Sequence, residues 1–252
     1  MDRRFRIETD NAPSSLGYRS NGMTAAGYVF TGGHIGSPLG QPGEHLPLAP
    51  TLEEQTDWCL RHAEQLSLAG GAPKDRVVEV EAFLVPFERQ DVVRKHIVDF
   101  LGYEPPLVHI RPVRSMAMSA LLELDWIALA DPNITIEEAT EVLRPWGHKP
   151  GLVRSGPFVM INGLSAPGET LTEQTYNLFA EADRQFQAAG SALSNVIKLS
   201  VFMGGGQYPD FNEATKKIFA NFEPPTRSVL SAPDITGDSL LKIDLIALAG
   251  EP

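Results

Sequence analysis

The chain has 252 residues and a mass of 27.5 kDa, which is too long for one minimal core and long enough for two domains of ordinary size. Hydrophobic residues make up 42% and charged residues 21% of the sequence, so the composition excludes a disordered protein. The formal net charge of −11 argues against nucleic acid as a partner, because phosphate backbones are repelled by an acidic surface.

Cysteine usage and hydropathy exclude several further classes. The single cysteine, Cys59, excludes an internal disulfide, and no cysteine and histidine residues have the spacing of a zinc site. We therefore expect no metal, no cofactor and a reducing compartment. The N-terminus lacks the apolar segment of a signal peptide, and 18 apolar residues never occur in succession. These features predict a cytoplasmic protein with no membrane partner.

The first half of the chain has a clear order of predicted elements. An apolar strand at 28–31 is followed by a loop and by a Thr-x-x-Glu capping box at Thr51, which starts a helix of about five turns. An alternating β-branched pattern predicts a strand at 78–84, and a second helix covers 91–100. A Glu-Pro-Pro turn then leads into a terminal hairpin of two strands. A short helix at 134–143 follows the hairpin.

The second half repeats these elements in the same order. The corresponding predictions are a strand at 158–161, a helix from Thr170 to about 190, a strand at 197–203, a helix at 210–219 and a second terminal hairpin. Strands and helices are mixed rather than strictly alternating, which predicts an α+β fold with helices on one face of a mixed sheet.

The two halves are an internal repeat. One shift of 119 positions, without gaps, relates three separate landmarks. The matching segments are 51–56 with 170–175, 104–106 with 223–225, and 121–125 with 240–244.

The repeat also sets the predicted domain boundaries. Gly33 matches Gly163 at a shift of 130, so the first copy carries an insertion of 11 residues in its loop at 36–50. We predict a first domain at 1–130, a linker with a short helix at 131–150, and a second domain at 151–252.

These motifs together resemble the Rid (YjgF/UK114) family, here as two tandem domains, over roughly 20–130 and 145–250. The resemblance implies α+β domains of the chorismate mutase-like type, each a mixed β-sheet with two helices packed on one face. It also implies homotrimers that associate through apolar sheet faces, with clefts between subunits that bind small carboxylates. Archetypal members are reactive intermediate imine deaminases, which hydrolyse enamines and imines to keto acids and ammonia.

The resemblance implies two site residues in the second copy. Arg227 follows the Pro-Pro turn where the family places its carboxylate-binding arginine, and a guanidinium can hold a planar carboxylate with two hydrogen bonds. Asn212 matches a family asparagine on the second helix. The first copy has Val108 and Val93 at these positions, so we predict that its own cleft is degenerate, and apolar or blocked.

The family's acidic residue is split from the arginine between the copies. It corresponds to Glu123 in the first copy and to Lys242 in the second, with Asp244 two residues further along the same strand face. A composite cleft could therefore draw Arg227 from one domain and polar groups from the other. Otherwise the second copy lacks its proton-handling carboxylate. Further predicted substrate-binding residues are Gly163, Asn162, His148 and Tyr18.

Three functions follow from these residues. The first is hydrolysis of a small, carboxylate-bearing imine or enamine to a keto compound and ammonia. The second is a non-hydrolytic tailoring reaction of a biosynthetic pathway, by a cyclase or isomerase, which Lys242 in place of the acid favours. The third is ligand binding or regulation without turnover.

Overall fold

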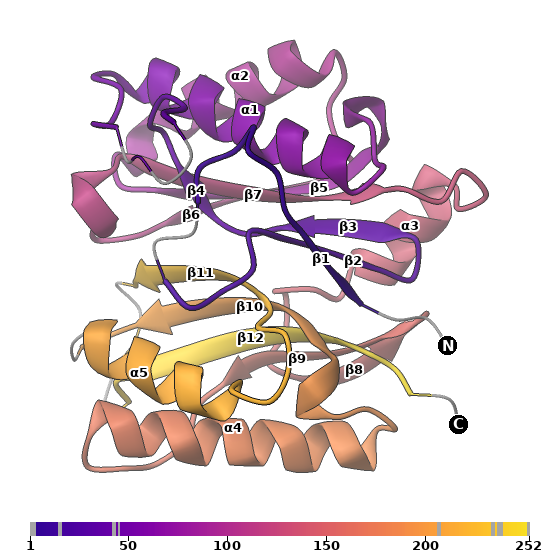
Figure 1. Cartoon of the computed structure of the whole chain (residues 1–252), viewed down its shortest axis with the longest axis vertical. Helices are drawn as coiled ribbons and strands as arrows, with labels where there is room; N and C mark the ends of the chain where they lie inside the picture. Colours follow the sequence, from indigo (N-terminus) through magenta and orange to yellow (C-terminus); the bar gives the residue numbers. More distant parts are fainter. Residues whose placement is uncertain are drawn as a thin grey trace.

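The computed structural model describes residues 4–14, 17–41, 44, 46–205, 208–232, 235 and 239–250. Two β-sheets lie face to face in the middle of the molecule, and helices cover the outer face of each sheet (Figure 1). The layers therefore run helix, sheet, sheet, helix, which confirms the predicted α+β class and the two helices on one face of each sheet.

The first sheet has the order β1-β2-β3-β7-β5-β6, with β4 paired to β7. Only β5 and β6 run parallel among the described pairs, so the sheet is mixed. Its elements are β1 (Phe5–Ile7), β2 (Gly22–Ala25), β3 (Tyr28–Thr31), β4 (His34–Ile35), α1 (Leu52–Ala69), β5 (Val77–Leu84), α2 (Gln90–Leu101), β6 (Leu107–Pro112) and β7 (Leu122–Leu129).

The second sheet has the order β11-β10-β12-β9-β8, and β10 and β11 are its parallel pair. Its five strands repeat the order β6-β5-β7-β3-β2 of the first sheet. Its elements are β8 (Gly151–Ser155), β9 (Phe158–Leu164), α4 (Leu171–Ala188), β10 (Val196–Met203), α5 (Tyr208–Ile218), β11 (Thr226–Ser231) and β12 (Leu241–Leu248).

Both predicted capping boxes are present. The Thr51 hydroxyl accepts the Glu54 backbone N–H at 3.2 Å, and the Glu54 carboxylate accepts the Thr51 N–H at 3.2 Å. The same reciprocal bonds join Thr170 and Glu173 at the start of α4. Each pair satisfies two backbone donors that the first turn of a helix leaves unpaired, which is why the sequence marks these two helix starts so clearly.

The predicted terminal hairpins are wrong. β6 and β7 do not pair with each other but flank β5 on opposite sides, and β11 and β12 flank β10 in the same way. The helix between β5 and β6 returns the chain to the same end of the sheet, so β6 adds in parallel at the edge. This topology puts β6 and β11 at edges of their sheets, where each can face the other domain.

The inner faces of the two sheets share two apolar clusters, one around Tyr28 and Phe158 and a second around Phe83 and Phe202. The aromatic rings of Tyr28 and Phe158, from opposite sheets, meet edge to face with centroids 5.1 Å apart. The segment between the domains closes the first of these clusters: helix α3 (Ile136–Leu143), within the predicted linker, buries Leu143 there, and Trp146 follows it, fully buried. The apolar sheet faces are thus covered within a single chain.

Candidate functional site between the two domains

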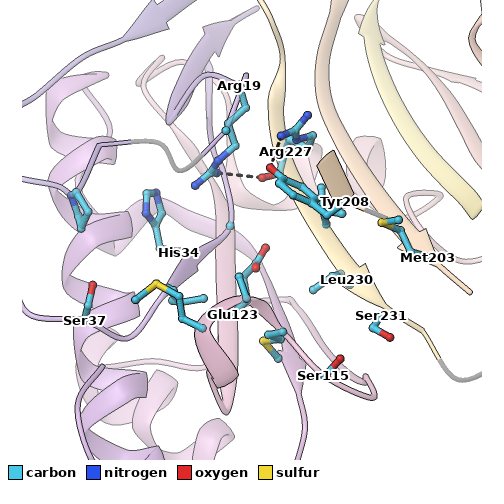
Figure 2. A pocket seen from close by; sticks show the side chains of 18 of the residues that line it. Arg19, His34, Ser37, Ser115, Glu123, Met203, Tyr208, Arg227, Leu230 and Ser231 are labelled. Carbon is cyan, nitrogen blue, oxygen red and sulfur yellow. Dashed lines mark hydrogen bonds between the residues drawn. The ribbon is translucent and has the colours of Figure 1, made fainter. Parts of the chain in front are cut away.

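A cavity of about 420 Å³ lies between the two sheets and is lined by both domains. Glu123 enters it from β7 of the first domain, and Arg227 enters it from β11 of the second (Figure 2). The arginine and the acid that the sequence separates between copies therefore line one composite pocket. Tyr208, at the start of α5, lines the same side as Arg227.

Arg227 is held by neutral groups. Its side chain is only 3% exposed, and its guanidinium donates to the Tyr208 hydroxyl at 2.8 Å and to the Thr215 hydroxyl at 3.1 Å. Burial lowers the pKa of Arg227 to about 10, which leaves the group charged at neutral pH. Among the described residues no carboxylate forms an ion pair with Arg227, and its Nε has no hydrogen-bond partner.

Asn212 supports Arg227 from the second helix. Its Oδ1 accepts Arg227 Nη2 at 2.8 Å and also the backbone N–H of Tyr18 at 3.1 Å. The Tyr18 hydroxyl donates to the Phe219 carbonyl at 3.2 Å. Asn212 thus orients the arginine and anchors the N-terminal segment at Tyr18, and neither Asn212 nor Tyr18 lines the cavity.

A second arginine, Arg19, was not found from the sequence. The segment before β2 crosses onto the second domain, where the Ser20 N–H donates to the Pro225 carbonyl at 3.0 Å. This places Arg19 in the pocket, with Nη1 donating to the Arg227 carbonyl at 3.0 Å. Burial lowers the pKa of Arg19, while the charge of Glu123 partly restores it. Two guanidinium groups therefore share this end of the pocket.

Glu123 is buried beside these arginines. Burial raises the pKa of Glu123 to about 7, although the charge of Arg19 acts in the opposite direction. The close approach of the two domains here requires Gly33, because a β-carbon on that residue would overlap Glu123 and the Ser228 hydroxyl. At neutral pH a large share of Glu123 carries its proton.

His34 follows Gly33 and also lines the pocket. Burial, together with the charge of Arg19, moves the pKa of His34 well below its usual value, so the imidazole is neutral at pH 7. Its Nε2 is buried and has no hydrogen-bond partner among the described residues. This nitrogen and Arg227 Nε leave two buried polar atoms in the lining unsatisfied.

The other predicted site residues gather at a different cavity, of about 280 Å³, on the opposite side of the domain interface. Asp244 accepts the Gly163 N–H at 2.6 Å, and burial raises the pKa of Asp244 to about 6. The Lys242 ammonium lies over the Phe202 ring, 5.5 Å from its centroid. The predicted residues that line this second cavity are Lys242, Asp244, Gly163, Asn162 and His148.

This second cavity is charged, so the expectation of an apolar or blocked cleft in the first copy is not met. Arg111 of β6 lies 3.9 Å from Asp244 and enters the lining. Asn162 plays a structural part there, because its amide accepts the Gly147 N–H at 3.0 Å and donates to the Pro145 carbonyl at 2.9 Å. Val93 is fully buried in the core of the first domain and donates nothing to either cavity.

A buried polar network runs between the two cavities. Lys198, 2% exposed, donates to Asp125 at 2.5 Å and lies 3.8 Å from Glu81. Asp125 in turn accepts the Ser228 hydroxyl at 2.9 Å, close to Glu123, and Glu81 pairs with Arg111 at 3.2 Å. Ion pairs and the hydrogen bonds of the Ser228 hydroxyl therefore link the groups of one cavity to those of the other.

No group of three or more potential metal-binding side chains occurs in the part of the chain that the structure describes. None of the described helices combines the length and the apolar character that crossing a membrane requires.

Comparison with known proteins matches the chain in domain-sized units. Residues 149–249 match the family model described as Endoribonuclease L-PSP. No curated protein matched the sequence. Among solved structures, the Rid-family protein YyfA from Yersinia pestis is 27% identical with a TM-score of 0.45, and the match covers 50% of this chain and 99% of that one. RidA from an Antarctic Psychrobacter is 20% identical with a TM-score of 0.46, and the match covers 50% of this chain and 98% of that one. Yeast Mmf1 is 18% identical with a TM-score of 0.47, and the match covers 51% of this chain and 100% of that one.

Each of these structures is matched over nearly its whole length by about half of this chain. The family match thus covers the second domain of the chain, residues 149–249, which match the model described as Endoribonuclease L-PSP.

Proposed function

We propose that the pocket between the domains hydrolyses a carboxylate-bearing imine or enamine to a keto compound and ammonia. The observation that carries this proposal is the pairing of Arg227 from one domain with a buried acid, Glu123, from the other. An imine derived from an amino acid presents a carboxylate and a basic nitrogen on the same carbon atom. The pocket offers a cation for the first and a proton for the second.

Arg227 and Arg19 are the groups that would bind the carboxylate. Among the described residues the Arg227 guanidinium donates to neutral oxygen atoms, whereas Arg19 lies in the field of Glu123. A buried cation without a counter-ion is unfavourable, and an incoming carboxylate with two hydrogen bonds removes that cost. Asn212 and Tyr208 keep the Arg227 guanidinium in one orientation, so little side-chain entropy is lost on binding.

Glu123 is the group that would move protons. With a pKa of about 7 it holds a proton in a large share of molecules at neutral pH and can also release it, which suits general acid and base catalysis. In the reaction, water adds across the C=N bond to form a carbinolamine. Glu123 donates a proton to the departing nitrogen and regains one from the carbinolamine hydroxyl. The products are the keto compound and ammonia, so atoms and charge balance.

Lys242 stands in the second copy at the position of the family's acidic residue, and this substitution is the feature that favours a non-hydrolytic reaction. It lines the second cavity instead, and the first domain supplies the carboxylate to the Arg227 pocket. Cleavage of RNA, which the description of the family model suggests, suits this chain poorly. A net charge of −11 opposes binding of a polyanion, and the pocket is buried between two sheets.

The test is ammonia release from imines that an L-amino-acid oxidase produces in the assay from alanine and leucine. We expect the protein to accelerate imine loss, and Glu123→Gln to lower kcat by about 10²- to 10⁴-fold. Glu213→Gln, an exposed change on α5, is the matched control and should leave the rate unchanged. Full activity of Glu123→Gln would contradict the role given to Glu123, and absence of acceleration with any imine would contradict hydrolysis itself.

A further inference from the structure

The pocket has two chemically different ends. Arg19, Arg227 and Tyr208 gather at one side with Glu123 beyond them, whereas Leu230, Met203 and Ser231 line a wall that extends away from the arginines (Figure 2). The charged side chains among the described lining residues all belong to the first end or its border with His34. Met116 and Met118 follow Ser115, which pairs with Ser231, and Ile35 and Leu46 are further apolar side chains of the lining.

The apolar end is built across the domain interface. The segment before β7 contains a short 3-10 turn, Ala117–Ser119, and is tied to the second domain where the Arg114 N–H donates to the Ser231 carbonyl at 2.7 Å. Met118 and Ser119 have φ angles of 55° and 62°. Residues with side chains rarely adopt this left-handed region, and such strain is concentrated at ligand sites.

The apolar end also leaves hydrophobic surface uncovered. Met118 is 52% exposed, although methionine ordinarily packs inside a protein, and it lines the cavity. A ligand that covers this surface gains affinity from burial of its own apolar groups, at about fourfold for each methylene. Methionine side chains are flexible and polarizable, so such a wall accepts both aliphatic and aromatic groups.

The size of the cavity also indicates a ligand with a large apolar group. A volume of about 420 Å³ lies in the range of pockets that enclose drug-sized ligands. A small imine such as 2-iminopropionate, with its carboxylate on Arg227 and its nitrogen near Glu123, would leave the whole methionine-lined end to water.

We propose that the pocket selects α-imino acids with a large apolar side chain, of the kind that leucine, methionine or phenylalanine would give, and disfavours those with short or charged side chains. This substrate class rests on the imine hydrolysis proposed above. The carboxylate occupies the arginine end, the C=N bond lies beside Glu123, and the side chain lies between Met116 and Met203.

The test separates binding from turnover. Calorimetry with 2-oxo acids, which are stable and have the shape of the products, measures binding without chemistry. We expect 2-oxohexanoate and phenylpyruvate to bind at least about tenfold more tightly than pyruvate, because each adds several buried carbon atoms. Equal or weaker binding of the longer acids would overturn the substrate class, whether or not the protein hydrolyses imines.

A variant of the apolar end links this preference to the pocket. Met203→Gln keeps the length of the side chain but adds an amide, and Met203 is half-buried at the end of β10, so the change is compatible with folding. The variant should bind phenylpyruvate about fivefold or more weakly than the natural protein does, while its affinity for pyruvate stays the same. Leu68→Gln on the exposed face of α1 is the control and should alter neither affinity.

Activity gives a second readout. If imines from leucine and phenylalanine are hydrolysed with a higher kcat/KM than the imine from alanine, both proposals are supported. If no imine is hydrolysed but the longer oxo acids still bind more tightly, hydrolysis is contradicted and the ligand class stands. Loss of pyruvate and phenylpyruvate binding by the same factor in Met203→Gln would overturn the assignment of the apolar end.

Discussion

Phe83 and Phe202 lie 119 positions apart, which is the shift of the internal repeat, and their rings contact each other with centroids 6.1 Å apart. Glu81 and Ser200, also 119 apart, are hydrogen-bonded at 3.5 Å. Equivalent residues of the two domains thus meet at the interface, as expected when two domains are related by an approximate twofold axis.

The reciprocal contacts of this arrangement explain the two cavities. Ser228 on β11 bonds Asp125 on β7, and Arg111 on β6 lies near Asp244 on β12. The edge strand of each domain therefore faces the last strand of the other. This is why Arg227 meets Glu123 rather than Lys242, and why one side of the axis retains an arginine and an acid while the other has diverged.

Lys198 should be among the most sensitive residues of the interface. Lys198→Met would leave Asp125 and Glu81 buried without their shared cation, and we expect a loss of about 3–5 kcal/mol of unfolding free energy in urea titrations. Lys217→Met, which removes an exposed ion pair with Glu213, should cost less than about 1 kcal/mol. Similar losses in both variants would show that the buried network does not stabilise the interface.

Asn212 should act through Arg227. Asn212→Ala removes one acceptor from the guanidinium, so we expect weaker binding of a 2-oxo acid, by about 1–2 kcal/mol in calorimetry. Asn212→Asp should weaken binding of the 2-oxo acid more than Asn212→Ala does, because it provides Arg227 with a permanent carboxylate that competes with the ligand. An aspartate variant that binds as well as the natural protein would show that the charge of Arg227 is not what holds the ligand.

Much of the fold follows from local signals, whereas only part of the site does. The capping boxes at Thr51 and Thr170 need only residues three positions apart, and the repeat is visible without any structure. Arg19 joins the pocket through a contact with Arg227 across 208 positions, and nothing near Arg19 in the sequence signals that contact. The pairing of edge strands across the interface is equally long-range, so sequence alone could not assign Glu123 and Lys242 to separate cavities.

The packing of the two sheets on each other bears on the oligomeric state. The resemblance to the Rid family implies a homotrimer whose apolar sheet faces meet between subunits, whereas here these faces pack on each other within one chain and Trp146 is buried among them. We therefore expect light scattering at micromolar concentration to give the mass of one chain, 27.5 kDa. A threefold larger mass would support the trimer and would require an interface outside this core.

The pH dependence of activity should report Glu123. Since the proposed mechanism needs its protonated form as the acid, kcat should fall as the pH rises through about 7. Arg227 does not titrate in this range, because its pKa is about 10. A kcat that is constant between pH 6 and 8 would contradict the assignment of Glu123 as the proton donor.

The same group should make stability depend on pH. The pKa of Glu123 is raised from its ordinary 4.5 to about 7 in the folded protein, so the folded state holds the proton more tightly than the unfolded state. The stabilisation that comes from the bound proton is complete below about pH 4.5 and is lost as the pH rises through 7, a change on the order of 3 kcal/mol. Glu123→Gln removes this titration. In urea titrations the free energy of unfolding of the variant, relative to that of the natural protein, should therefore rise by about that amount between pH 4.5 and pH 8. The exposed control Glu213→Gln should keep the natural slope, and an identical slope in Glu123→Gln would mean that Glu123 is ionised in the folded protein throughout this range.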